Sequence, residues 1–96
     1  MITHVVTFRW KPETTAEQIA AVTEGLATMP GLVPTIAGYS YGPDLAIGGN
    51  MDYAVVATFE SVDDWRAYDS HPDHERLRAE LIRPYLADRA AVQFEG

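Results

Sequence analysis

A tyrosine and three histidines are the side chains of this sequence best suited by type and spacing to acid–base chemistry. Tyr68, His71 and His74 fall in the short segment Tyr68-Asp69-Ser70-His71-Pro72-Asp73-His74, and His4 lies near the N-terminus. A neutral imidazole can accept a proton near neutral pH, and a phenol can donate a hydrogen bond to a developing oxyanion. We therefore predict that Tyr68 and His74 form an acid–base pair for proton transfer next to a carbonyl group.

Each of these residues also has a structural interpretation. His4 alternates with apolar residues and can be a core histidine with backbone or tyrosine partners. His71 precedes Pro72, where a capping or packing role is favoured. Tyr68 can be a helix residue that is hydrogen-bonded to His74. Since His74 lies early in a predicted helix, the positive end of the helix dipole should lower its pKa and keep the ring neutral.

The same segment raises the question of a metal site. His71 and His74 are three residues apart, with Asp69 and Asp73 nearby. Catalytic zinc usually has three protein ligands, often including two histidines four apart on one helix, and Pro72 interrupts a regular face. The chain has no cysteine. We predict no metal.

We also predict no cofactor, because the only glycine-rich segment has the wrong context. Gly48-Gly49-Asn50 is followed by neither a lysine nor a helix, as a phosphate-binding loop would be.

Four segments carry the patterns of β-strands. Alternation and β-branched or aromatic content predict strands at Ile2–Trp10, Thr35–Tyr41, Asp52–Glu60 and Arg89–Glu95. In the first strand, His4 shares a side with Val6 and Phe8.

Helical patterns lie between these strands. Thr14 and Glu17 have the spacing of a capping box, and Ile19, Val22, Leu26 and Met29 then form an apolar stripe up to Pro30-Gly31. Ser61 is the predicted cap of a second helix.

Pro72 marks a break and restart after the second helix, before an apolar side made of Leu77, Leu81 and Ile82. Pro84 should end this last helical segment.

The order β-α-β-β-α-α-β predicts one ferredoxin-like α+β domain over residues 1–96, with a four-stranded antiparallel sheet and all helices on one face. Val5, Ala54 and Val56 would then lie on the uncovered face. Because an exposed apolar sheet face favours a partner, we predict a homodimer in which two sheets pack face to face as a dimeric α/β barrel.

Charge and hydrophobicity exclude several partners. The net charge of −7 disfavours nucleic acid and anionic membranes, and no apolar run is long enough to cross a bilayer. The N-terminus enters a strand pattern directly, without the features of a signal peptide, so a cytoplasmic location is expected.

Over essentially its whole length the sequence resembles the stress-responsive A/B-barrel family. The resemblance is carried by the following segments in combination: His4-Val5-Val6, Pro30-Gly31-Leu32-Val33-Pro34, Tyr41-Gly42-Pro43-Asp44, Phe59-Glu60-Ser61 and Tyr68 to His74. The family resemblance implies a homodimeric barrel. It does not imply one function, because members include stress-associated proteins as well as a plant polyketide cyclase that closes its substrate by aldol condensation.

The similarity to that cyclase implies roles for individual residues. Tyr68 and His74 match its acid–base pair, while His4, Asp44 and Tyr53 match pocket-lining positions. His71, in the same segment, is a further candidate for substrate binding. Aromatic residues that shape the cyclase's substrate pocket are replaced here by Val22 and Leu26, so the substrate need not be the same.

Two functional hypotheses follow. The first is a cofactor-free cyclase, lyase or isomerase that acts on a polyketide-like or phenolic carbonyl compound. The second is a non-catalytic, stress-associated dimer that binds a small molecule or serves a structural role.

Overall fold

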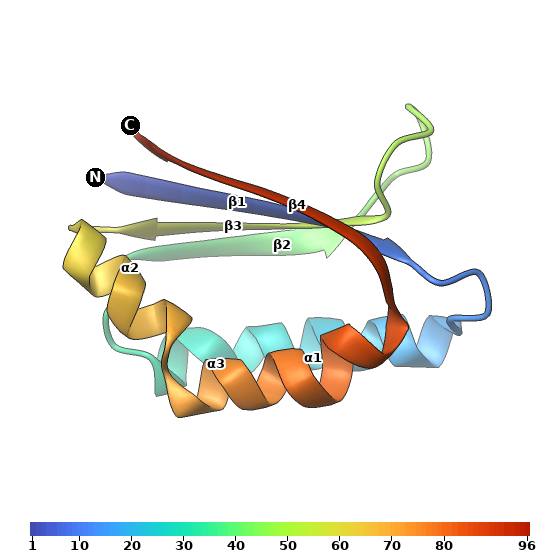
Figure 1. Cartoon of the computed structure of the whole chain (residues 1–96), viewed down its shortest axis with the longest axis horizontal. Helices are drawn as coiled ribbons and strands as arrows, with labels where there is room; N and C mark the ends of the chain where they lie inside the picture. Colours follow the sequence, from blue (N-terminus) through green and yellow to red (C-terminus); the bar gives the residue numbers. More distant parts are fainter.

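The computed structural model describes residues 1–96 and contains one four-stranded antiparallel sheet with its helices on one face (Figure 1). The order in the sheet is β2-β3-β1-β4. In chain order the elements are β1 (Ile2–Trp10), α1 (Ala16–Leu32), β2 (Gly38–Pro43), β3 (Tyr53–Phe59), α2 (Val62–Asp69), α3 (Pro72–Leu77), a π-helical turn η1 (Arg78–Ile82), a 3-10 turn η2 (Arg83–Tyr85) and β4 (Leu86–Glu95). The predicted ferredoxin-like arrangement is confirmed.

The core lies between the sheet and the helices. Alternate residues of β1 and β3 point toward the helices and are buried, including Val6, Phe8 and Phe59. Val22 and Leu26 of α1 pack against them from the other layer. The predicted side of β1 is therefore the buried one, and it places His4 under the helices.

Helix α1 begins one residue later than predicted. Thr15, not Thr14, is the N-cap: its hydroxyl accepts from the Gln18 amide at 3.2 Å, and the Gln18 side chain accepts from the Thr15 amide at 2.9 Å. The capping box therefore pairs Thr15 with Gln18 and does not involve Glu17. The Thr14 amide instead donates to the Lys11 carbonyl at 3.0 Å in the preceding turn, which places Thr14 outside the helix.

The other end of α1 and the start of β2 also differ from prediction. Pro30 lies inside the last turn of α1, which continues to Leu32 and ends where the Val33 amide donates to the Met29 carbonyl. Strand β2 is shifted to Gly38–Pro43. Since β2 is an edge strand, Pro43 is tolerated in it despite having no amide hydrogen.

The break between α2 and α3 is confirmed, and it sets the positions of the candidate site residues. Ser61 caps α2, and His71 caps α3 by accepting from the Asp73 amide through Nδ1 at 3.2 Å. Pro72 occupies the first turn of α3. This turn places Tyr68, near the end of α2, against His74, in the first turns of α3.

The chain after α3 differs in detail from prediction. The predicted end at Pro84 falls within the turn η2, and β4 begins at Leu86, three residues earlier than predicted. Beyond Leu86 every residue of β4 is exposed, because β4 is an edge strand that the helices do not cover. The end of β4 lies beside the start of β1, because the Gly96 amide donates to the Met1 carbonyl at 2.9 Å.

The face of the sheet away from the helices carries an apolar row. Val5 pairs with Val56 on β3 and with Val92 on β4. Val92 is 56% exposed and Phe94, further along β4, is 50% exposed. None of the helices has the length and hydrophobicity needed to cross a membrane.

Candidate active site

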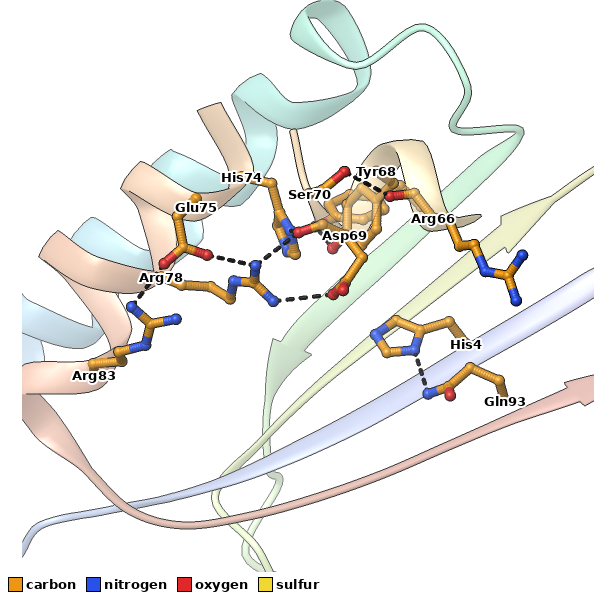
Figure 2. A network of polar contacts seen from close by, with 11 residues as sticks. His4, Arg66, Tyr68, Asp69, Ser70, His74, Glu75, Arg78, Arg83 and Gln93 are labelled. Atoms are coloured by element: carbon orange, nitrogen blue, oxygen red, sulfur yellow. Dashed lines mark hydrogen bonds and ion pairs between the residues drawn. The ribbon is translucent and has the colours of Figure 1, made fainter. Parts of the chain in front are cut away.

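A cavity of about 270 Å³ lies between the helical layer and strands β1 and β4. Eight of its lining residues are hydrophobic, and four of them, Val6, Phe8, Leu26 and Val55 from β1, α1 and β3, form an apolar floor. Three of the predicted residues, His4, Tyr68 and His74, line this cavity together. They come from β1, α2 and α3, and their side chains gather under the α2–α3 turn (Figure 2).

His74 is a buried, neutral imidazole with one free nitrogen. Its ring lies over the ring of Tyr68, with centroids 3.9 Å apart. Because the Asp69 carbonyl, 3.3 Å from Nδ1, can only accept, Nδ1 carries the hydrogen and Nε2 holds the free lone pair. Burial, and next the Arg78 guanidinium, lowers the pKa of His74 to about 4. The predicted direction of this pKa shift is confirmed, but its main cause is burial and not the helix dipole.

His4 has the opposite tautomer. The Gln93 amide nitrogen lies 2.9 Å from Nδ1 of His4, and an amide nitrogen can only donate. Nδ1 therefore accepts, and the hydrogen of the neutral ring is on Nε2. Burial, and next the positive charge of Arg89, lowers the pKa of His4. The cavity thus holds one imidazole that presents a lone pair and one that presents an N–H group.

Tyr68 is 2% exposed, and its hydroxyl lies 2.9 Å from the hydroxyl of Tyr39 on β2. The hydrogen bond to His74 considered from the sequence is not formed; the two rings instead pack against each other at an angle of 31°. Burial raises the pKa of Tyr68, so its hydroxyl stays protonated at neutral pH and can donate. The pKa of Tyr39 is raised further, again chiefly by burial.

An ion-pair network holds the outer wall of the site (Figure 2). Arg78 donates to the Asp69 carboxylate at 3.0 Å and to the Asp69 carbonyl at 2.7 Å. It also donates to Glu75 at 2.6 Å, and Glu75 in turn pairs with Arg83 at 2.8 Å. Because the Asp69 carbonyl accepts from both Arg78 and His74, this network fixes the carbonyl that sets the His74 tautomer.

The other three predicted residues do not line this cavity. Asp44 and Tyr53 line a second cavity of about 410 Å³, beside the β2–β3 loop. The Tyr53 hydroxyl lies 2.7 Å from Thr23 Oγ1, and Asp44 accepts from the Ala46 amide. His71 is the cap of α3, the structural role that the sequence favoured for it.

Several residues of the site were missed by sequence reasoning. Arg78 follows His74 by four residues, a spacing that places both on one side of a helix and could have indicated it. Gln93 and Arg89 become visible only through the register between β1 and β4, which pairs Gln93 with His4 and Arg89 with Phe8. Tyr39 has no sequence signal that links it to Tyr68.

The residues described do not form a metal centre. No group of three or more histidine, aspartate or glutamate side chains is arranged so that it could hold an ion. His71 and His74 do not act together, because His71 caps α3 whereas His74 lines the cavity.

The sheet order, the helical layer and the cavity between them define a ferredoxin-like α+β domain with one cavity between its two layers. The chain belongs to the Stress Responsive A/B Barrel Domain family, whose model matches residues 2–96.

Solved structures agree with this assignment. A dimeric ferredoxin-like protein of unknown function from Thermobifida fusca YX is 43% identical, with a TM-score of 0.91 over 99% of this chain and 90% of that one. A dimeric protein of unknown function from Bacteroides fragilis is 22% identical, with a TM-score of 0.86 over 99% and 95% of the two chains.

The hydroxynitrile lyase from Passiflora edulis shares the fold at 19% identity, with a TM-score of 0.84 over 97% of this chain and 90% of that chain. No curated protein matched the sequence.

Proposed function

We propose that this protein is a cofactor-independent acid–base enzyme of the lyase, cyclase or isomerase type, acting on a small polyketide-like or phenolic carbonyl compound. The observation that carries the proposal is the free Nε2 lone pair of a neutral His74 in a cavity that it shares with Tyr68 and His4. A base and hydrogen-bond donors around one space are what proton transfer next to a carbonyl requires.

The three side chains would have distinct roles. His74 would remove a proton through Nε2, while the Tyr68 hydroxyl would donate to the oxygen on which negative charge develops. The His4 N–H group would provide a second donor. Arg78 and Asp69 act as positioning residues, because they hold the carbonyl that fixes the His74 tautomer.

The low pKa of His74 restricts the substrate. A base whose pKa is about 4 is fully unprotonated at neutral pH, but it is a weak base. It suits a proton that is already acidic, such as one on a carbon between two carbonyl groups. This chemistry supports a polyketide-like substrate, and the relative that is a hydroxynitrile lyase supports only that the fold can host a lyase.

Isotope exchange provides the test. The protein is incubated in D₂O with a panel of aryl ketones and 3-oxo esters, and loss of the α-proton signal is followed by NMR. We expect at least one compound to exchange faster than in buffer, and His74→Gln to reduce this by about 100-fold or more. His71→Asn is the matched control, since asparagine preserves the cap of α3 and should retain activity. If no compound is accelerated, or if His74→Gln matches the parent, the proposal fails.

A non-catalytic binding function is the second candidate. It is favoured by the burial of Tyr68 and by its hydroxyl, which already has the Tyr39 hydroxyl as a partner. Ligand binding to the cavity without any exchange would select this alternative.

We also propose that the chain is a homodimer that packs through the bare face of its sheet. Related structures are described as dimeric, and the row formed by Val5, Val56 and Val92 gives that face an apolar centre. Covering the exposed Val56, Val92 and Phe94 would add the buried area that a short chain lacks.

A further inference from the structure

The cavity is bordered by an unusual share of the positive charge of the molecule. Arg78, Arg83 and Arg89 line it, and they are three of only seven basic residues in a chain with a net charge of −7. Asp69 is the one acidic residue in its lining. A protein that is acidic overall has therefore gathered basic groups around one apolar space.

These three arginines differ in how they are neutralised. Arg78 pairs with Asp69 and Glu75, and Arg83 pairs with Glu75, so two acids balance two bases. Arg89 has no ion pair. One positive charge at the cavity thus remains without a counterion from the protein.

The unpaired guanidinium lies on the open side of the cavity. Arg89 belongs to the same row of β4 as Gln93, on the side that faces the helices, and β4 is exposed there. Arg78 and Arg83 lie across from it on the helical segment that follows α3. The arginines therefore stand at the rim, while His74 and the apolar floor lie further in.

We propose that the cavity binds a small organic carboxylate, with its negative group held at the rim by Arg89 and its apolar body directed toward Tyr68 and His74. This inference deepens the proposed function and rests on it for the reaction, but not for the binding. A guanidinium recognises the planar carboxylate group through paired N–H donors.

The remainder of the cavity fits the apolar part of such a ligand. Val6, Phe8, Leu26 and Val55 supply aliphatic and aromatic surface below the rim. The volume of about 270 Å³ is just below the range of roughly 300–1,000 Å³ typical of drug-sized ligands, so the ligand is small. A free inorganic phosphate could use the arginines but would leave this apolar surface unused.

A bound anion would also change the acid–base groups. Burial and positive charge keep the pKa of both cavity histidines low, with Arg78 acting on His74 and Arg89 on His4. A carboxylate held by Arg89 would offset the positive charge that contributes to the lowered pKa of His4.

Paired ligands that differ only in charge test this inference. Binding of benzoate, salicylate and hexanoate is measured by calorimetry beside benzamide, salicylamide and hexanamide, with inorganic phosphate as a further probe. We expect at least one carboxylate to bind about tenfold more tightly than its amide, and more tightly than phosphate. Added salt should weaken carboxylate binding and leave amide binding unchanged.

Two variants test whether Arg89 causes the preference for the carboxylate over the amide. Arg89→Gln should remove most of the preference for the carboxylate while leaving amide binding as it was. Arg66→Gln is the control, since Arg66 is an exposed arginine whose side chain points away from the network in Figure 2. The inference is overturned if no pair prefers the carboxylate, if the preference survives Arg89→Gln, if Arg66→Gln abolishes it equally, or if phosphate binds as well as the carboxylates.

The same measurements separate this inference from the proposed reaction. Carboxylate binding that depends on Arg89, with no isotope exchange in any substrate, would uphold the inference and reject the enzyme. Exchange that depends on His74 but shows no preference for anionic substrates would uphold the enzyme and reject the carboxylate site.

Discussion

At the scale of single residues, the site is defined by which nitrogen of each histidine carries the proton. A backbone carbonyl fixes one tautomer at His74, and a side-chain amide fixes the other at His4. Burial then keeps both rings neutral. The sequence identified the histidines and the tyrosine but not these partners. Gln93 and Tyr39 are brought close only by the fold, and Asp69 acts through its backbone carbonyl, which side-chain patterns do not reveal.

The low pKa of His74 predicts that the free energy of unfolding decreases as the pH falls. Its pKa falls from an ordinary 6.5 to about 4 on folding, so the unfolded chain takes up a proton below pH 6.5 while the native protein does not. Stability is therefore lost as the pH falls through 6.5 toward 4, by about 2 kcal/mol between pH 7 and pH 5. The lowered pKa of His4 adds to the same trend.

Urea unfolding at the two pH values, at one fixed protein concentration, measures this dependence. His74→Gln should show a smaller difference between them, whatever its absolute stability. Equal stability of the parent protein at both values would contradict the assigned pKa.

Removing the Tyr68 hydroxyl should slow isotope exchange more than removing the Tyr39 hydroxyl. Tyr68→Phe keeps the ring that packs against His74 but removes the donor, so we expect the isotope-exchange rate to fall by about 100-fold. Tyr39→Phe removes only the outer partner of that hydroxyl and should cost about tenfold or less. An equal loss in both variants would show that the pair of hydroxyls acts as one structural unit.

At the scale of elements, the site depends on how closely α1 approaches the segment from α3 to η1. Gly25 of α1 makes this approach possible: a Cβ atom there would lie 2.5 Å from a methyl group of Leu77 and 2.8 Å from one of Leu81. Leu77 also lines the cavity. The packing of two helical segments therefore bears directly on the wall of the site.

Gly25→Val should accordingly destabilise the protein. The overpacked side chain forces Leu77 to move, and we expect the free energy of unfolding to fall by about 2 kcal/mol relative to Gly31→Val. Gly31 lies in the last turn of the same helix with open space around it, so Gly31→Val makes the same substitution without the overpacking. Chemical denaturation of the two variants makes the comparison, and equal stabilities would exclude a tight contact at Gly25.

The element pattern was largely predictable, and its errors have local causes. Alternation located β1 because its buried side is strictly periodic, whereas β3 was located by a run that is apolar on both sides. The cap of α1 was misplaced by one residue because Thr14 and Thr15 both have suitable side chains, and only backbone geometry selects between them. The π-helical turn at Arg78–Ile82 has no sequence signature, yet it contributes both Arg78 and Ile82 to the cavity lining.

At the scale of the whole molecule, the two faces of the sheet differ in what covers them. One is covered by helices and encloses the cavity, and the other exposes an apolar row. Hydrophobic alternation could predict both, because each face follows from the same period of two. The arrangement of a second chain on the bare face cannot be deduced from that periodicity.

The proposed dimer should be sensitive to charge at the centre of that row. Val92→Lys places a charge on the bare face and should shift the protein toward monomer, with a loss of thermal stability, because desolvating the ammonium group opposes packing. Val62→Lys alters another exposed valine, on α2 and outside that face, and should remain dimeric. Sedimentation or light scattering distinguishes the outcomes, and a monomeric parent protein would refute the dimer.

The pairing of β1 with β4 determines when the cavity can form during synthesis of the chain. His4 and its partner Gln93 are separated by 89 positions in the chain, and Arg89 enters beside them only with the last strand. A nascent chain on the ribosome therefore cannot assemble the cavity until β4 has been synthesised, and the high contact order of this pairing slows folding further. Ligand binding at this cavity would thus report that β4 has been made and has paired with β1.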